Sequence, residues 1–292
     1  MPELPEVQAL VTDLSRRLIG REIARLDIVA FAALKTYDPP VSALEGLTIS
    51  GIVRHGKFLD ISASQNGASD LHIVVHLARA GWLRWRNNAP LATVRRGAGP
   101  LAARLVLAHD GSGFDLTEAG TKKSLAIWIV RDPAEVPRLG MLGPDPMADD
   151  FTEAKLADIL AAAGRSQIKG VLRDQRQIGG IGNAYSDEIL HVAKMSPFKP
   201  ASMAPDDIHE LYVAIRSTLT EAVERSDGLA ASELKGEKKS NLRVHARNGL
   251  LCPVCGDTIR QVIYSDSTFQ YCPTCQTGGK PLADRVLSRL LK

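Results

Sequence analysis

The chain has 292 residues, of which 45% are hydrophobic, 24% charged and 5% aromatic. These fractions are typical of a globular protein and exclude a disordered, collagen-like or coiled-coil chain. The net charge is only +3, from 36 Lys and Arg against 33 Asp and Glu, so overall charge by itself indicates no nucleic-acid partner.

The first residues predict neither a targeting signal nor a membrane segment. Residues 1–7 carry two acids and two prolines where a signal peptide has basic residues followed by an apolar run. No apolar stretch approaches the roughly 20 residues that a membrane helix requires. We therefore expect a cytoplasmic protein with no membrane partner.

Residues 1–132 read as a helix followed by a β-rich domain. Apolar residues at helical spacing predict a helix over 7–19. Farther on, short β-branched runs separated by turn residues predict an antiparallel sandwich or barrel. The expected strands are 47–54, 58–62, 72–77, 103–107 and 125–130, and 87–100 is expected to be an exposed loop.

The rest of the chain divides into a linker, a helical part and a C-terminal part. Prolines and glycines crowd into 133–150, as in a linker between domains. Residues 151–235 show helical periodicity, with helices expected at 152–163, 167–175, 184–194 and 205–225. Residues 236–292 are basic and turn-rich, and they contain all four cysteines.

The four cysteines predict a metal site. Cys252 and Cys255 form one C-x2-C pair, and Cys272 and Cys275 form a second after sixteen intervening residues. Two such pairs let four thiolates converge tetrahedrally on Zn²⁺. Because sulfur would fill all four positions, we expect one structural zinc ion rather than a catalytic one. The alternative, two disulfides or four buried thiols, is disfavoured in a cytosolic chain.

A basic cluster precedes the first cysteine pair. Only Glu237 opposes its members, which are Lys235, Lys238, Lys239, Arg243 and Arg247. Positive charge concentrated on a small zinc hairpin favours contact with a phosphate backbone. The alternative is an ordinary solvated surface.

A glycine-rich turn joins two of the predicted helices. Gly179, Gly180 and Gly182 precede a helix that begins at about Asn183. Glycine permits close backbone approach to a ligand, and the amides of a helix N-terminus can bind a phosphate. The spacing is not that of a dinucleotide-binding motif. A plain helical hairpin is the alternative.

The residues at the N-terminus could supply a reactive amine. Removal of Met1 would leave Pro2 with a secondary amine, and an α-amino group with a pKa near ~8 is partly unprotonated at neutral pH. Such an amine can attack an aldehyde-level carbon and form an iminium ion. Glu3 could transfer protons, with Glu6 supporting it. Alternatively, Pro2 and Pro5 only stiffen the start of the chain.

Together these features resemble the formamidopyrimidine-DNA glycosylase / endonuclease VIII family of base-excision repair enzymes over nearly the whole chain. The matching motifs are Met1-Pro-Glu-Leu-Pro-Glu-Val7, Arg54-His-Gly-Lys-Phe-Leu59, His76-Leu77, Leu142-Gly-Pro-Asp-Pro146, Asp174-Gln175, Gly182-Asn-Ala-Tyr185 and the four cysteines. The resemblance implies a multi-domain α+β fold. Its parts would be an N-terminal catalytic β-sandwich with flanking helices (1–132), a helix–two-turn–helix DNA-binding domain (151–235) and a zinc-finger β-hairpin (236–292).

The resemblance also implies a DNA glycosylase with abasic-site lyase activity. Pro2 would attack C1′ of a damaged nucleoside in double-stranded DNA, Glu3 would act as general acid and base, and β-elimination, in much of the family followed by δ-elimination, would cut the strand. Lys57 and Asn183 would contact phosphates beside the lesion. Such a protein would associate with the nucleoid, and a monomer is the habit of the family.

Three departures from the family pattern affect DNA contacts. Arg79 stands where a Met is usual, and Gly120-Thr-Lys-Lys123 replaces an Arg-Arg-Phe-Gly run. Asp266-Ser-Thr268 replaces the usual zinc-finger Arg, for which Arg247 or Lys239 could compensate. We therefore expect the covalent chemistry to be kept, with weak or absent excision of 8-oxoguanine. Arg79 could stack into the gap left by an extruded base, whereas Trp82 and Trp85 are better read as core residues.

Two other functions are compatible with parts of this pattern. A non-catalytic protein that recognises damaged or branched DNA would explain the lost contacts, but not the retained Pro2, Glu3, Lys57 and Asn183. A zinc-ribbon protein that binds structured RNA would explain the helices and the cysteines, and only the N-terminus argues against it.

Overall fold

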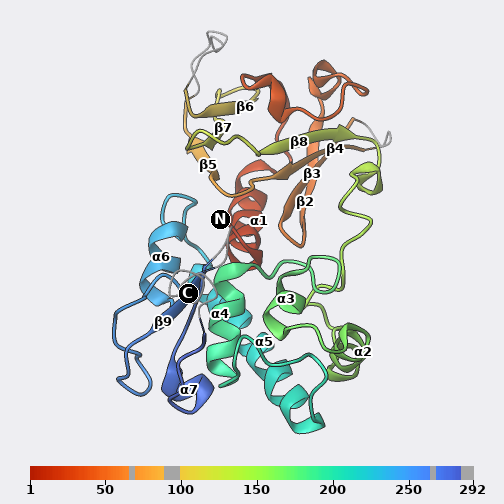
Figure 1. Ribbon diagram of the computed structural model, residues 1–292. Coiled ribbons are helices and arrows are strands. Elements are labelled where there is room, and N and C mark those ends of the chain that lie inside the picture. Colours follow the sequence, from red (N-terminus) through yellow and green to blue (C-terminus); the bar gives the residue numbers. More distant parts are fainter. Residues whose placement is uncertain (66–69, 89–98, 264–267, 284–292) are drawn as a thin grey trace. The chain divides into compact units, whose positions relative to one another are not determined.

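The computed structural model describes residues 1–65, 70–88, 99–263 and 268–283. They form two compact units, whose elements are labelled in Figure 1. The first unit comprises Met1–Leu142 together with Ser226–Lys235, and the second comprises Gly143–Arg225 and the chain from Gly236 onward. Most of the expected loop at 87–100 lies outside the described residues.

Helix α1 (Leu4–Leu18) opens the first unit and begins three residues before the predicted start. Pro5 fits the first turn, where a missing N–H costs no hydrogen bond, and Glu3 and Glu6 form a capping box. The leucines of its inner face are fully buried in the core of the unit. Each such side chain stabilises the fold by about 1.5–3 kcal/mol.

Two four-stranded antiparallel sheets contribute to this core and make up the predicted β-sandwich (Figure 1). One sheet has the order β2 (Thr48–His55), β3 (Phe58–Ser64), β4 (Leu71–His76) and β8 (Ala126–Val130). The other has the order β1 (Ile23–Ile28), β6 (Leu101–Leu107), β7 (Gly113–Glu118) and β5 (Gly81–Arg86). The predicted sandwich architecture is confirmed.

Strands β1, β5 and β7 are not predicted by the sequence. Strand β7 carries only two apolar side chains, Phe114 and Leu116, which is a weak signal, and its Asp115 is only 1% exposed. The guanidinium of Arg104 on β6 donates two hydrogen bonds to this carboxylate, at 2.6 and 3.0 Å. Charged residues are mostly exposed in folded proteins, so the sequence alone predicts a turn or surface position for a charged residue that is in fact buried with its partner.

Residues 226–235 belong to the first unit, although the sequence groups them with the preceding helices. Ala231 and Leu234 are buried in the core of that unit. The Trp82 indole N–H donates to the Ala231 carbonyl at 2.9 Å, and the Lys235 ammonium lies 4.5 Å from the centre of the Trp82 ring. Trp82 is therefore a core residue, as expected, and it anchors this segment.

The second unit contains helices and a small hairpin. Its elements are α2 (Glu153–Ala163), α3 (Ile168–Arg173), α4 (Asn183–Val192), α5 (Pro205–Ser226), α6 (Leu234–Asn241), β9 (Arg260–Ile263), β10 (Thr268–Tyr271) and α7 (Pro273–Thr277). Helices α2 to α5 lie within two residues of their predicted bounds, whereas α6 is not predicted, because its basic run lacks apolar periodicity. Among the described residues, no helix is long and apolar enough to cross a membrane.

Candidate active site and nucleic-acid interface

Pro2, Glu3 and Glu6 are buried at the start of α1. Glu3 is 2% exposed and Glu6 is 1% exposed. The Glu3 backbone N–H donates to a carboxylate oxygen of Glu6 at 2.8 Å. This bond fixes the residue that follows Pro2, so Glu6 holds the N-terminal pair in place.

Lys57 occupies the two-residue turn between β2 and β3. Gly56 precedes it with a φ of 55°, a left-handed conformation that suits glycine in a tight hairpin. The Arg54 guanidinium donates to the Gly56 carbonyl at 3.2 Å and to the side-chain oxygen of Gln8 on α1 at 3.0 Å. These two bonds tie the Lys57 turn to the helix that begins after Pro2 and Glu3.

His76 at the end of β4 adds a neutral group near Lys57. Its ring lies against Phe58, with 4.7 Å between ring centres. Burial, followed by the nearby charges of Lys57 and Arg138, lowers the pKa of His76 to about 4. His76 is therefore uncharged at neutral pH, and the positive charge near it comes from Lys57 and Arg138.

A further polar cluster lies on the strands of the same hairpin. The buried Asp60 carboxylate on β3 lies 3.2 Å from His55 Nε2 on β2 and 2.9 Å from His72 Nδ1 on β4. One carboxylate thus connects three neighbouring strands. No spacing in the sequence indicates this cluster, because each member comes from a different strand.

Arg79 is exposed in the tight turn between β4 and β5. Ala78 has a φ of 53°, and the Gly81 N–H donates to the Leu77 carbonyl at 2.9 Å. A Cβ atom at Gly81 would meet that carbonyl oxygen at 2.0 Å, so only glycine fits this position. The turn therefore presents Arg79 to solvent, whereas Trp85 on the following strand packs against the core.

Lys122 and Lys123, which replace the expected Arg–Phe pair, lie on an exposed loop. The Lys123 ammonium donates to the Glu118 carbonyl at 2.5 Å. The Glu118 carboxylate accepts the backbone N–H groups of Ser124 and Leu125. Hydrogen bonds to Glu118 thus hold the loop in place. Its sequence contains no aromatic side chain.

In the second unit, Gln175 braces the turns between α3 and α4. Its side-chain nitrogen donates to the carbonyls of Arg173 and Ile181, and its oxygen accepts the Gly180 N–H. Helix α4 begins at Asn183, as the sequence predicts. The positive end of the helix dipole therefore lies at Asn183.

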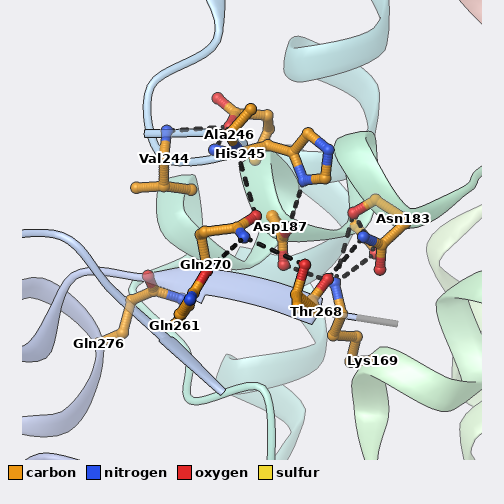
Figure 2. A network of polar contacts seen from close by, with 12 residues as sticks. Lys169, Asn183, Asp187, Val244, His245, Ala246, Gln261, Thr268, Gln270 and Gln276 are labelled. Carbon is orange, nitrogen blue, oxygen red and sulfur yellow. Dashed lines mark hydrogen bonds and ion pairs between the residues drawn. The ribbon is translucent and has the colours of Figure 1, made fainter. Parts of the chain in front are cut away.

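The Asn183 side chain connects α4 to the cysteine-bearing hairpin. Its Nδ2 donates to the Thr268 carbonyl at the start of β10 at 2.7 Å (Figure 2). Its Oδ1 is buried and has no hydrogen-bond partner among the described residues. One hydrogen of the Asn183 side-chain amide is thus already bonded within the protein.

Some members of the basic cluster have partners within the second unit. The Lys238 ammonium lies 4.5 Å from the centre of the Tyr185 ring, and the Arg243 guanidinium lies 3.4 Å from a carboxylate of α5. Lys239 is exposed on α6. Arg247 is half-buried, and no partner for its Nε occurs in the described part of the chain. Lys239 and Arg247 are therefore the better candidates for binding an anion.

The four predicted cysteine ligands converge. The Sγ atoms of Cys252 and Cys275 are 3.9 Å apart, and those of Cys255 and Cys272 are 3.3 Å apart. Sulfurs around a tetrahedral zinc ion with bonds of ~2.3 Å are separated by about 3.8 Å. Burial raises the pKa of the Cys272 thiol to about 11, so a thiolate at neutral pH requires a bound cation. The donor set fits a metal ion.

His191 on α4 joins the cysteine cluster, and the sequence does not indicate it. Its Nε2 lies 3.3 Å from Cys252 Sγ. The donor atoms of His191, Cys252, Cys272 and Cys275 all lie within 4.8 Å of one another. His191 stands 61 positions before Cys252, in a helix with no cysteine, so spacing carries no signal.

The chain matches two family models. The formamidopyrimidine-DNA glycosylase N-terminal domain matches residues 1–123, and the H2TH domain of the same enzymes matches residues 142–233. An uncharacterised formamidopyrimidine-DNA glycosylase-like protein of Mycobacterium tuberculosis is 57% identical over 160 residues, which are 54% of this chain and 99% of that protein. The formamidopyrimidine-DNA glycosylase of Symbiobacterium thermophilum is 33% identical and covers 94% of this chain and 89% of its own length.

Solved structures agree with these matches. The Lactococcus lactis formamidopyrimidine-DNA glycosylase, non-covalently bound to abasic-site DNA, has a TM-score of 0.79 at 26% identity and covers 94% of this chain and 99% of its own. The Thermus thermophilus enzyme has a TM-score of 0.77 at 29% identity and covers 96% of this chain and 100% of its own. The capped N-terminal helix, the β-sandwich, the helix–two-turn–helix and the cysteine hairpin thus occur together, and the chain belongs to the formamidopyrimidine-DNA glycosylase / endonuclease VIII family of DNA glycosylases.

Proposed function

We propose that the protein is a bifunctional DNA glycosylase and abasic-site lyase of base-excision repair. The observation that carries this proposal is the position of Pro2 and Glu3. They directly precede a capped helix in which Glu6 holds Glu3 in place, and Arg54 ties that helix to the Lys57 turn. Double-stranded DNA that contains damaged bases or abasic sites is the proposed substrate.

In the first step, the Pro2 nitrogen, freed by removal of Met1, attacks C1′ of the damaged nucleoside. A C–N bond forms and the glycosidic bond breaks, and the departing base takes the electron pair and a proton. The amine loses its proton, and Glu3 protonates the ring oxygen as it leaves C1′, so that an iminium ion remains.

In the second step, the iminium ion acts as an electron sink that acidifies the hydrogen on C2′. Loss of this proton expels the 3′-phosphate and cuts the strand by β-elimination. The damaged nucleotide must first leave the base stack, at a cost of about a few kcal/mol that damaged pairs reduce. We assign to Lys57 the phosphate beside the reacting sugar.

The second unit would hold the DNA backbone. The N-terminal end of α4 at Asn183, together with Lys239 and Arg247, offers positive charge for a neighbouring phosphate. The four cysteines would bind one zinc ion, which supplies no chemistry to the reaction and holds the hairpin in shape.

The proposed specificity differs from that of an 8-oxoguanine glycosylase. Arg79 is exposed where the family commonly has a Met wedge, and Lys122 and Lys123 replace the Arg–Phe pair. Excision of 8-oxoguanine opposite C should therefore be slow relative to cleavage at an abasic site. Equal rates on the two substrates would refute this part of the proposal.

Trapping with sodium borohydride tests the function. Incubation with abasic-site DNA and borohydride should yield a covalent protein–DNA band, because the reagent reduces the iminium ion to a stable amine. Pro2→Gly and a protein that retains Met1 should both lose the band. A protein that binds abasic DNA tightly but yields no band would instead be the non-catalytic damage-recognition protein, which the missing wedge residues favour.

A further inference from the structure

A histidine of helix α4 lies against the cysteine cluster, and the proposed function does not use it. His191 is 3% exposed, and its Nε2 lies 3.3 Å from Cys252 Sγ. Its other ring nitrogen, Nδ1, is buried and has no hydrogen-bond partner among the described residues. The imidazole thus directs one nitrogen at a proposed metal ligand.

The four cysteines differ in their access to solvent. Cys255 is exposed, whereas Cys252 and Cys272 are buried and Cys275 is of intermediate exposure. The Cys255 sulfur lies 3.3 Å from that of Cys272. Because the reactions of a cysteine depend on its exposure, Cys255 is the thiolate most open to competing ligands.

His191 forms a second set of four donors with three of the cysteines. The mutually close donor atoms, all within 4.8 Å of one another, belong to His191, Cys252, Cys272 and Cys275. Cys255 is not in this group of described residues. Around a tetrahedral zinc ion, bonds of ~2.3 Å to sulfur and ~2.0–2.1 Å to nitrogen separate the two atoms by about 3.5 Å. His191 and Cys255 are therefore alternative fourth ligands to the same three sulfurs.

The two donor sets differ in strength. When four thiolates are bound, the Nε2–H of His191 donates to Cys252, because a metal-bound thiolate has no proton to offer. When Nε2 binds the metal ion instead, the ring proton moves to Nδ1, for which the described residues offer no acceptor. A buried donor without an acceptor is unfavourable. The set of four cysteines is thus the stronger one.

We propose that His191 is a reserve ligand of the metal centre. When the Cys255 thiolate is unavailable, Nε2 of His191 takes its place beside the other three cysteines, and the zinc ion is retained. The metal ion then joins the cysteine-bearing hairpin directly to α4. This inference does not rest on the proposed function, because it concerns only the retention of the metal ion.

Zinc affinity and X-ray absorption test this inference. The full-length, zinc-loaded protein is titrated with a chromophoric chelator, and the ligands are identified from the zinc absorption edge. The wild type should show four sulfurs at ~2.3 Å. Cys255→Ala should bind one zinc ion about 10- to 100-fold more weakly, because Nδ1 is left without an acceptor. Its spectrum should show three sulfurs and one nitrogen at ~2.0–2.1 Å, with the scattering pattern of an imidazole ring.

His191→Phe distinguishes a reserve ligand from a plain hydrogen-bond donor. In the wild-type background it removes only the bond to Cys252, so the zinc affinity should fall about tenfold. In the Cys255→Ala background it removes a ligand, so the affinity should fall at least about 100-fold and the imidazole scattering should vanish.

Cys275→Ala is the matched control, since it makes the same substitution at a shared sulfur. The mutually close set then keeps only three donors, so this variant should bind zinc more weakly than Cys255→Ala. Circular dichroism of each zinc-loaded variant confirms that it is folded.

The outcomes are distinguishable. If Cys255→Ala shows no imidazole scattering, or loses zinc as readily as Cys275→Ala, His191 is not a ligand and the inference fails. Equal losses of affinity from His191→Phe in the two backgrounds would show a hydrogen-bond donor only, and would also overturn it. None of these measurements involves DNA, so the proposed function is tested separately by borohydride trapping.

Discussion

His76→Gln tests the arrangement of charge around Lys57. His76 has a pKa of about 4 in the folded chain, against an ordinary value of 6.5. Between pH 6.5 and pH 4 the His76 imidazole binds a proton in the unfolded chain but not in the folded chain. The free energy of unfolding therefore decreases as the pH falls toward 4. The two pKa values predict that His76 alone costs the wild type about 2 kcal/mol of unfolding free energy between pH 7 and pH 5.

Urea unfolding at pH 7 and pH 5 measures this loss. His76→Gln lacks the titrating group, so it should lose about 2 kcal/mol less than the wild type over the same interval, because all other groups titrate equally in both proteins. Lys57→Met should fall between the two, since burial, the largest cause of the shift, remains. An equal loss of stability in the wild type and His76→Gln would refute the neutral state of His76 beside Lys57.

Three other predictions follow from the same structure. Asp115→Ala should lower the free energy of unfolding in urea by about 3–5 kcal/mol, because it leaves the buried Arg104 unpaired. Arg86→Met removes only the half-exposed partner of Asp115 and should cost about 1 kcal/mol or less. Equal losses in the two variants would contradict this ranking. Glu6→Ala should lower the free energy of unfolding by about 1 kcal/mol, because the helix loses its cap. The same variant should slow borohydride trapping at least about tenfold, because Glu3 is no longer held in place. Unchanged trapping would show that Glu6 has no supporting role. Chelation of the metal should weaken binding to abasic DNA but leave intact the reaction of the N-terminal amine with a free aldehyde. Loss of both the DNA binding and the aldehyde reaction would contradict a purely structural zinc ion.

The sequence predicts those elements whose pattern is local. The helices of 151–226 follow from apolar periodicity, and the cysteine cluster follows from two close pairs. Strand β7 escapes prediction because only Phe114 and Leu116 in it are apolar, and the burial of Asp115 depends on a partner on another strand. The core positions of Ala231 and Leu234 also escape prediction, because they pack against residues far away in sequence, which no local pattern reveals.

The candidate site shows the same limit. Pro2, Glu3, Lys57 and Asn183 are found through motifs, and their roles stay predictions. The groups that hold them come from distant parts of the chain and have no common spacing, as with Arg54 and Gln8, His191 and the cysteines, or Lys169, Asp187 and His245. Such contacts depend on tertiary packing and can only be read from the folded chain.

The central claim is that the nitrogen of Pro2 forms the bond to deoxyribose. Protein trapped on abasic DNA by borohydride, digested and examined by peptide mass spectrometry, tests this claim directly. Our account predicts that the N-terminal peptide begins at Pro2 and carries the reduced sugar fragment. An adduct on a lysine side chain, or an untrapped N-terminal peptide that still carries Met1 in an active preparation, would contradict it.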